Sequence, residues 1–357
     1  MSIDDIIFSE EYWYLRWLFY VCAIIGLVRL KVCTVNLLCF TCRHCCRCRQ
    51  NLLRKYKDGQ RETWAVVTGG SDGIGFEFCK KFARQGFNIC IISRSQQKID
   101  AKLKELTEMY PNIQTKAVAA DLSTMYTIEE YHRLVLEHGL FDLDIGVLCL
   151  NAGRVSIGPI DLLTDADIQT MITLNALHVV YLTKALLNQL RSRPSRSAII
   201  IVSSGISGMP IPGVSTYSCS KSLVSNFGQA LHYEVRDKID VTVWEPGSTD
   251  TKIIQGTDKS FWTMSPSDSV DGYLCQHGRT RLTCGPMKHD IASIGNDFFP
   301  LGLVGGKIAD DIRRDYKEGK YKGMRSPHHS PRKLSEARSP LKERLLSPPP
   351  NKSMKFE

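Results

Sequence analysis

The sequence predicts an α/β fold built on a doubly wound parallel sheet, and three observations support this prediction. Short β-branched segments alternate with amphipathic helical segments from residue 63 onward. The strand segments are apolar almost throughout, which is typical of parallel strands covered by helices on both faces. A glycine-rich turn joins the first strand segment directly to a helix. A sheet of this kind places its ligand site at the carboxyl ends of the strands.

The expected elements follow one another along a single domain. Strands are expected at residues 64–68, 88–93, 114–120, 145–150, 198–203 and 240–245. Helices are expected between them at residues 76–85, 99–109, 165–190 and 221–236. We therefore expect one Rossmann-like domain at residues 60–312, with an apolar segment at residues 1–50 before it and a disordered tail at residues 324–357 after it.

The N-terminal segment is strongly apolar but carries scattered charges. Its longest uncharged run, residues 17–28, has 12 residues, fewer than the roughly 20 that span a bilayer. Acidic residues precede the apolar stretch and basic residues follow it, at Arg43, Arg47, Arg49, Arg54 and Lys55. By the positive-inside rule the domain then faces the cytosol. We expect an anchored or hairpin-inserted N-terminus; the alternative is an apolar helix buried against the domain.

Seven of the 13 cysteines lie before Arg49, and the other six are scattered. This uneven, odd-numbered set differs from a secreted disulfide framework, so we expect reduced thiols. Zinc usually takes two separated pairs of ligands, and the cluster at residues 39–48 has no second pair. Cysteines among arginines beside an apolar segment suit S-palmitoylation. Unmodified thiols are the alternative.

The net charge of +9 is concentrated in two flanks. Residues 43–57 hold six basic and no acidic residues, and residues 313–357 hold 13 basic and 5 acidic residues. A nucleic-acid-binding fold carries its positive charge on the domain itself, so we expect no nucleic-acid partner. The tail carries four Ser-Pro pairs, which suit either proline-directed phosphorylation or an idle solubilising tail.

The first strand ends in a turn that predicts a dinucleotide site. Glycines at positions 69, 73 and 75 let the backbone approach a pyrophosphate, and the helix N-terminus that follows attracts its negative charge. The second strand ends at Arg94, where a basic side chain accommodates a 2′-phosphate and an acidic one would bind a ribose hydroxyl. The sequence thus favours NADP(H); the alternative is that Arg94 is a solvated surface charge.

A second group of residues predicts proton transfer. Tyr217 and Lys221 are four residues apart, so they share one face of a helix. A cation near a phenol lowers the pKa of the phenol, which makes Tyr217 a candidate general acid or base. Ser204 follows an expected strand and therefore lies at the carboxyl edge of the sheet.

These motifs resemble the short-chain dehydrogenase/reductase family over about residues 63–305. The resemblance implies that Asn175 holds a water in a proton relay and that Ser204 polarises a substrate carbonyl. It also implies that Tyr217 transfers the proton and that Lys221 lowers the pKa of Tyr217 and binds the nicotinamide ribose. We expect no metal ligand, and the residues expected to bind the cofactor are Thr68, Gly69, Ser71, Asp72, Gly73, Ile74, Gly75, Arg94, Asp121, Asn151, Ala152, Gly153, Tyr217, Lys221, Pro246, Gly247 and Thr251.

Within the family, the chain is most similar to the membrane-bound group of 17β-hydroxysteroid dehydrogenase type 12, or very-long-chain 3-oxoacyl-CoA reductase. The shared features are the apolar N-terminus, the segment 92–95 and the segment 203–212. The resemblance implies NADPH-dependent reduction of a lipid-like ketone at the endoplasmic reticulum membrane, in fatty acid elongation. Alternatives are a steroid or 3-ketodihydrosphingosine reductase, and a non-catalytic dinucleotide-binding scaffold. The long helices are also a candidate homodimer interface, as in the family.

A loop at residues 248–268 is the expected substrate loop, because its aromatic and apolar side chains could form a lid over the site. These side chains are Phe261, Trp262 and Met264. Plain packing of these side chains is the alternative.

Overall fold

A single parallel sheet forms the centre of the protein. The computed structural model describes residues 13–45, 51–57, 62–251, 260–296 and 300–321. Seven strands are ordered β3-β2-β1-β4-β5-β6-β7, and every neighbouring pair is parallel. The doubly wound fold class is confirmed. The strands are β1 (Thr63–Thr68), β2 (Asn88–Ser93), β3 (Thr115–Ala119), β4 (Asp144–Leu150), β5 (Ser197–Val202), β6 (Ile239–Trp244) and β7 (Leu282–Thr283).

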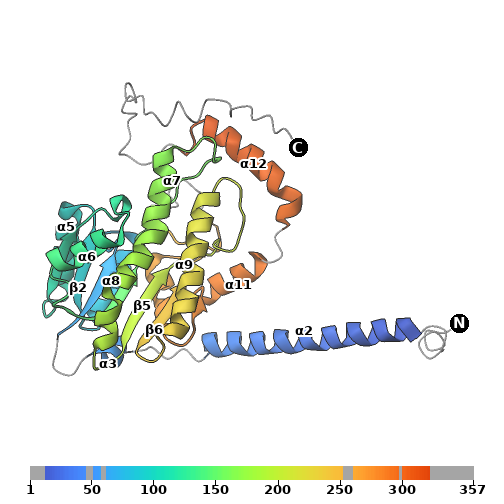
Figure 1. The fold of residues 1–357 in the computed structure, drawn as a ribbon, viewed down its shortest axis with the longest axis horizontal. Helices are drawn as coiled ribbons and strands as arrows, with labels where there is room; N and C mark the ends of the chain where they lie inside the picture. The colour runs from blue at the N-terminus through green and yellow to red at the C-terminus, as the bar shows by residue number, and fades with distance from the viewer. Residues whose placement is uncertain (1–12, 46–50, 58–61, 252–259, 297–299, 322–357) are drawn as a thin grey trace, which may run out of the picture.

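Helices cover both faces of the sheet (Figure 1). One face packs against α4 (Gly73–Arg84), α5 (Gln96–Met109) and α10 (Pro266–Leu274), where Phe78, Phe82 and Tyr273 are fully buried. The other face packs against α6 (Ile128–Glu137), α8 (His178–Ser192) and α9 (Ser215–Glu234). Successive strand residues alternate between the two cores, which explains why the strands are apolar throughout.

The order in which the strands are added to the sheet changes direction at β1. β1 pairs with β2 on one side and with β4 on the other. Connections from these strands leave in opposite directions, so a crevice opens at their carboxyl ends. The glycine turn after β1 and the segments after β2, β4, β5 and β6 all meet there.

Two parts of the fold differ from the expected elements. The expected helix at residues 165–190 is divided into α7 (Asp165–Ile172), a π-helical turn (Thr173–Leu177) and α8. The elements α6, β7, α10, α11 (Met287–Asn296) and α12 (Leu301–Lys317) were not predicted. Of these, α6 begins with a capping box in which Thr127 and Glu130 bond each other's backbone, and this is a signal that a sequence carries.

The apolar N-terminal segment forms one long helix, α2 (Trp13–Cys45), which projects away from the domain (Figure 1). At 1.5 Å per residue its 33 residues extend about 50 Å. Only His44 in this helix is buried, while Trp17 and Leu27 are 63% and 66% exposed. The alternative of a helix buried against the domain is therefore wrong, and α2 is continuous, so its residues do not form a hairpin.

Two helices of the described residues are long and apolar enough to cross a membrane. One is α2, with no buried residues in its most apolar window. The other is the continuous segment Asp165–Ser192, which is half buried. The second is therefore a core helix of the domain, and α2 alone presents its apolar side chains outward.

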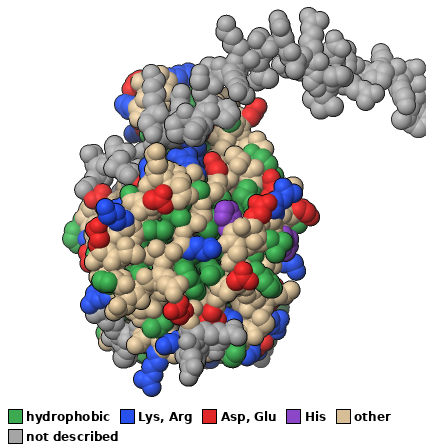
Figure 2. Space-filling model, turned by 90° about the vertical axis from the view of Figure 1, so that its left-hand side faces the viewer, with side chains coloured by type: hydrophobic (Ala, Val, Ile, Leu, Met, Phe, Trp, Pro, Cys, Tyr) green, Lys and Arg blue, Asp and Glu red, His purple; other side chains and the backbone are tan. Residues whose placement is uncertain are grey.

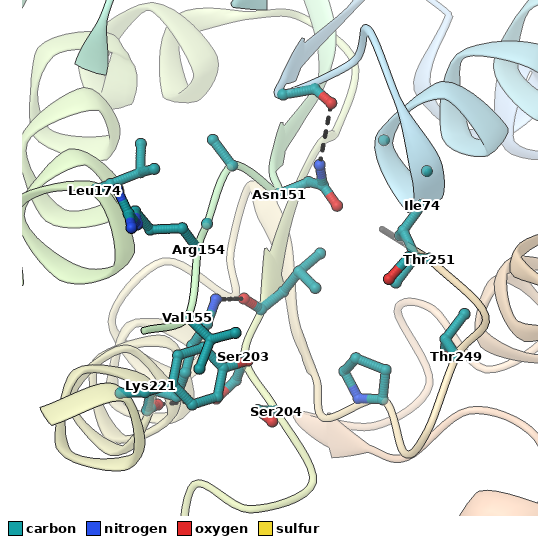
Figure 3. A pocket seen from close by; sticks show the side chains of 18 of the residues that line it. Ile74, Asn151, Arg154, Val155, Leu174, Ser203, Ser204, Lys221, Thr249 and Thr251 are labelled. Carbon is teal, nitrogen blue, oxygen red and sulfur yellow. Dashed lines mark hydrogen bonds between the residues drawn. The ribbon is translucent and has the colours of Figure 1, made fainter. Parts of the chain in front are cut away.

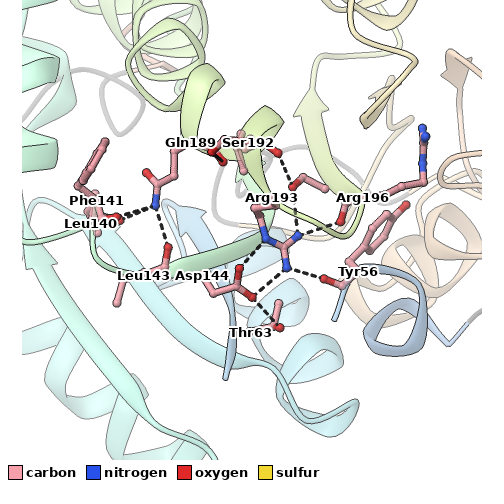
Figure 4. Close-up of polar contacts among 12 residues, drawn as sticks. Tyr56, Thr63, Leu140, Phe141, Leu143, Asp144, Gln189, Ser192, Arg193 and Arg196 are labelled. Atoms are coloured by element: carbon pink, nitrogen blue, oxygen red, sulfur yellow. Dashed lines mark hydrogen bonds and ion pairs between the residues drawn. The ribbon is translucent and has the colours of Figure 1, made fainter. Parts of the chain in front are cut away.

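The buried side chain of Arg193 joins neighbouring segments at the amino ends of the strands (Figure 4). Arg193 donates to both carboxylate oxygens of Asp144, at 2.6 and 2.9 Å, and to the carbonyl of Tyr56 at 2.7 Å. Tyr56 ends the short helix α3 (Leu52–Tyr56), and its hydroxyl donates to Asp240 at 2.9 Å. The segment that follows α2 is thus packed onto the domain at the end opposite the crevice.

The side of the molecule that carries α5 and α6 mixes acidic, basic and apolar side chains without a large area of one sign (Figure 2). Several expectations fall on residues outside the described part of the chain. These are the acidic residues before Trp13, the thiols of Cys46 and Cys48, the centre of the expected substrate loop at residues 252–259, and the tail with Ser326, Ser330, Ser339 and Ser347.

Candidate active site

A large cavity lies at the carboxyl ends of the strands. Its volume is about 1880 Å³, whereas a pocket for one small molecule measures about 300–1,000 Å³. It therefore has room for a dinucleotide and a second ligand together. Among the predicted site residues, the cavity is lined by Gly69, Ser71, Asp72, Gly73, Ile74, Gly75, Arg94, Asp121, Asn151, Ala152, Gly153, Ser204, Tyr217, Lys221, Pro246, Gly247 and Thr251.

The glycine turn brings its backbone to one wall of the cavity. Gly69 and Gly73 have φ angles of 66° and 50°, in the left-handed region that favours glycine. A Cβ at Gly75 would meet the Gly69 carbonyl oxygen of the turn and would approach the Asn151 Nδ2 atom to 2.5 Å, so a side chain there clashes with both. Asp72 caps α4 by accepting a hydrogen bond from the Gly73 amide at 2.9 Å. The amides at the start of α4 therefore face an open space suited to a pyrophosphate.

Thr68 does not line the cavity, although we expected it to bind the cofactor. It is fully buried, and its Oγ1 accepts hydrogen bonds from the amides of Asn151 and Ala152 at 2.9 and 3.0 Å. The Asn151 side chain in turn donates to the Thr68 carbonyl at 3.0 Å. Thr68 thus positions the segment after β4 beside the glycine turn.

The far end of the same wall carries Arg94 and Asp121. Arg94 follows β2, is exposed, and lines the cavity together with Lys98 from the first turn of α5. Asp121 follows β3, and its carboxylate accepts hydrogen bonds from the amide and the hydroxyl of Ser123 at 3.0 and 2.6 Å. The two basic side chains are suited to a phosphate because they are positively charged and line the same part of the cavity.

Ser204, Tyr217 and Lys221 all line the cavity. Figure 3 shows Ser204 and Lys221 on the wall opposite Ile74 and Thr251. The Ser204 and Tyr217 hydroxyls are hydrogen-bonded, as expected for two groups that meet at one substrate oxygen. Lys221 is 4% exposed, and its Nζ donates to the Val202 carbonyl at 2.8 Å. Burial lowers the pKa of Lys221 to about 8.

The expected lowering of the Tyr217 pKa by Lys221 is not found. Burial raises the pKa of Tyr217, and only the hydrogen bond with Ser204 opposes this shift. The physical reason is that the Lys221 ammonium is directed to the Val202 carbonyl. In the described state Tyr217 is therefore protonated at neutral pH, which is the form that a general acid needs.

Asn175 makes structural contacts beside the cavity. It lies in the π-helical turn, is fully buried, and does not line the cavity. Its Oδ1 accepts from the Arg154 amide at 2.8 Å, and its Nδ2 donates to the Arg154 carbonyl at 2.9 Å and to Ser220 at 3.1 Å. These contacts hold the segment after Gly153 in place, and the expected role of Asn175 in holding a water stays a prediction.

The sequence did not single out His289, which supports the segment after β6. His289 Nδ1 accepts a hydrogen bond from the Gly247 amide at 3.1 Å, and Nε2 faces the Ser248 carbonyl at 3.1 Å. These two contacts require a neutral ring with its proton on Nε2, and burial lowers the pKa of His289 in agreement. Pro246 and Thr251, which flank this supported segment, line the cavity opposite Lys221.

Arg154 was likewise not predicted. It lines the cavity directly after Gly153, and its guanidinium lies 3.3 Å from the buried Asp167 carboxylate of α7. Burial and the nearby Arg94 both lower its pKa, while Asp167 raises it. The sequence shows a basic residue directly after the Asn-Ala-Gly segment, but it carries no signal that this residue pairs with a carboxylate on α7.

The doubly wound sheet, the glycine turn and the Ser-Tyr-Lys group define a dinucleotide-binding protein of the reductase type. A family profile described as "short chain dehydrogenase" matches residues 63–260, more than half of the chain. The chain belongs to the short-chain dehydrogenase family, as its motifs predicted.

Several curated relatives are similar to the chain. A very-long-chain 3-oxoacyl-CoA reductase of Podospora anserina is 37% identical over 51% of this chain and 53% of that protein. A protein of the same name from Bos taurus is 37% identical over 68% of this chain and 79% of that protein. A 17-beta-hydroxysteroid dehydrogenase type 3 from Rattus norvegicus is 34% identical over 66% and 76%. The match thus spans about half of the fungal relative and about three quarters of the two mammalian ones.

Solved structures agree with the fold. A short-chain dehydrogenase from Sphingobium yanoikuyae in complex with NADPH has 27% identity and a TM-score of 0.58, and the match covers 68% of this chain and 94% of that one. A structure of 7beta-hydroxysteroid dehydrogenase has 21% identity and a TM-score of 0.62, over 74% and 99%. The second likeness concerns the fold alone.

Proposed function

We propose that the protein is an NADPH-dependent oxidoreductase that reduces a ketone to an alcohol on a lipid-like substrate. The observation that carries this proposal is the convergence of Ser204, Tyr217 and Lys221 on a cavity whose opposite wall is the glycine turn. Relatives named very-long-chain 3-oxoacyl-CoA reductase and an NADPH-bound relative support it.

The residues present fit an NADP(H) molecule. The turn at Gly69, Gly73 and Gly75 lines the cavity, and α4 begins there. Arg94 would hold the 2′-phosphate, and Asp121 would lie against the adenine. When bound, this cofactor supplies a hydride, and the protein supplies position and electrostatics.

The proton-transfer step follows from the opposite wall. Ser204 and Tyr217 would bind the same carbonyl oxygen through their hydroxyl groups. Because burial keeps Tyr217 protonated, its hydroxyl can donate a proton to this oxygen as the carbonyl carbon is reduced. Lys221 lies four residues further along the same helix and lines the cavity, where it would bind the nicotinamide ribose of the cofactor.

The substrate proposed is a very-long-chain 3-oxoacyl-CoA, and the reaction is the reduction step of fatty acid elongation. The relatives of that name support it, and so does the cavity volume, which exceeds that of a pocket for one small molecule. In this proposal residues 1–50 associate with the endoplasmic reticulum membrane, the domain at 60–312 faces the cytosol, and 324–357 form a regulatory tail. We also propose a homodimer in which the helices at residues 165–190 and 217–237 form the interface.

A steroid substrate is the second candidate, favoured by the relative named 17-beta-hydroxysteroid dehydrogenase type 3. A non-catalytic scaffold is the alternative of another class. The cavity-lining Ser204, Tyr217 and Lys221 argue against it, because binding a dinucleotide alone requires no proton donor.

The experiment is NADPH oxidation by the full chain in detergent, with a panel of ketones. The panel holds a long-chain 3-oxoacyl-CoA, a short-chain one, a 17-ketosteroid and 3-ketodihydrosphingosine. The proposal expects the highest kcat/KM with the long-chain 3-oxoacyl-CoA. A higher value with the steroid would replace the substrate, and no turnover with any ketone would refute the proposed activity.

A further inference from the structure

The mouth of the cavity is bordered by an unusual helix, α11. Its residues Ile291, Ala292, Ser293 and Gly295 line the cavity. On the same helix, Met287, Ile291 and Ile294 are 47%, 43% and 53% exposed. Their spacing of four and three residues places them on one face. The helix thus turns a stripe of apolar side chains outward at the cavity entrance.

Two aromatic side chains extend this stripe. Phe261 and Trp262 are 77% and 40% exposed, and their rings lie in edge contact at 5.3 Å. The Lys288 ammonium lies 4.1 Å from the Phe261 ring and so joins this loop to α11. We call Phe261, Trp262, Met287, Ile291 and Ile294 the α11 surface. A basic side chain beside exposed aromatic and aliphatic groups is typical of a surface that contacts lipid.

The same helix receives the end of α2. His44 Nε2 lies 2.6 Å from Asp290 Oδ2, and both side chains are buried. The other oxygen of Asp290 accepts from the Cys284 amide at 3.2 Å. Because this contact is buried and short, it fixes the last turn of α2 against α11. The apolar helix therefore leaves the domain next to α11, several of whose residues line the cavity, and in Figure 1 α2 and the end of α11 point to the same side.

We propose that the α11 surface rests on the lipid bilayer that α2 enters, so that an apolar ketone passes from the bilayer directly into the cavity. The occupant of this surface is a phospholipid membrane. The geometry points to it because α2 is the candidate span, and its end is fastened to the helix that carries the exposed stripe. The inference rests on the proposed function for its substrate, but the contact with lipid is independent of catalysis.

The contact is tested by fluorescence of the full chain in phosphatidylcholine vesicles with and without brominated acyl chains. The variant Trp13→Phe/Trp17→Phe removes the tryptophans of α2, and the remaining Trp64 and Trp244 are buried at 8% and 0% exposure. Bromine quenches a tryptophan only on close approach, so we expect quenching of Trp262. The further change Trp262→Phe should abolish it. Equal emission in both kinds of vesicle would overturn the proposal.

A second test uses kinetics. Met287→Asp/Ile294→Asp places charge on the α11 surface outside the cavity lining. We expect the apparent KM for a long-chain ketone in vesicles to rise by about tenfold, since charged groups are disfavoured in lipid, while kcat/KM for a short, water-soluble ketone is unchanged. Leu136→Asp is the matched control, because Leu136 is 69% exposed on α6.

The results of the two tests distinguish a lipid contact from other uses of the α11 surface. An equal rise in KM with Leu136→Asp, or no rise with either variant, would overturn the proposal. A change in sedimentation of the double variant would instead assign the α11 surface to a second copy of the chain, and it would overturn the lipid contact. Absence of turnover with every ketone in the wild type would refute the proposed function alone, because the quenching test needs no substrate.

Discussion

Replacing Arg94 by alanine tests the choice of cofactor. The Arg94 side chain is exposed on the cavity wall at the end of β2. A hydrogen bond from a charged group contributes about 1.5–3 kcal/mol, and exposure to water places Arg94 at the lower end. Since about 1.4 kcal/mol is a factor of ten, Arg94→Ala should lower kcat/KM for NADPH by roughly 10- to 30-fold. The value for NADH, which lacks the 2′-phosphate, should not change.

The assay is steady-state reduction of one ketone with each cofactor at several salt concentrations. Lys98 also lines this part of the cavity, so a residual preference for NADPH should remain and should weaken as salt screens it. Lys104→Ala is the matched control, because Lys104 is exposed on α5 and lies outside the cavity lining. Equal losses with NADPH and NADH would refute the assignment of Arg94 to the 2′-phosphate.

Three further variants test the turn, the fold and the buried lysine. Gly75→Ala should abolish NADPH binding in a fluorescence titration, because its Cβ would meet the turn, whereas Gly302→Ala has open space and should bind normally. Arg193→Met leaves the buried Asp144 carboxylate without its charged partner and should lower the free energy of unfolding in urea by about 3–5 kcal/mol. The exposed pair of Arg191 with Asp237 is the control, and its removal should lower this free energy by less than about 1 kcal/mol. Equal losses at the two sites would contradict the prediction. Burial lowers the pKa of Lys221 to about 8, so between pH 8 and about 10 the unfolded chain binds more protons than the folded one. The free energy of unfolding of the wild type should therefore rise with pH in this range, by up to about 1.4 kcal/mol per pH unit relative to Lys221→Met. The same pH dependence of unfolding in the wild type and in Lys221→Met would contradict this prediction.

The sequence predicted the sheet because its signals are local. Strands covered on both faces are continuously apolar, and the turn at residues 69–75 needs glycine wherever its backbone is left-handed or crowded. The chemical types of Ser204, Tyr217 and Lys221 and their positions at strand and helix ends were enough to place them on one cavity. The family followed from the same residues.

The remaining features depend on contacts between distant segments. The two amide contacts of Asn175 need Arg154 and Ser220, and the support of Gly247 by His289 joins residues 42 positions apart. The pKa of Tyr217 depends on where the Lys221 ammonium points, which spacing along a helix does not determine. The docking of His44 on Asp290 spans 246 positions and has no local signal.

The most direct test of the central claim is the replacement of Tyr217 by phenylalanine. The assay measures NADPH oxidation with any ketone that the wild type reduces, together with NADPH binding by fluorescence. Loss of a general acid costs about 100- to 10,000-fold in rate, so turnover should fall by at least about 100-fold while the Kd for NADPH stays the same. Equal turnover in Tyr217→Phe and wild type would contradict the account, because the cavity would then not transfer a proton through Tyr217.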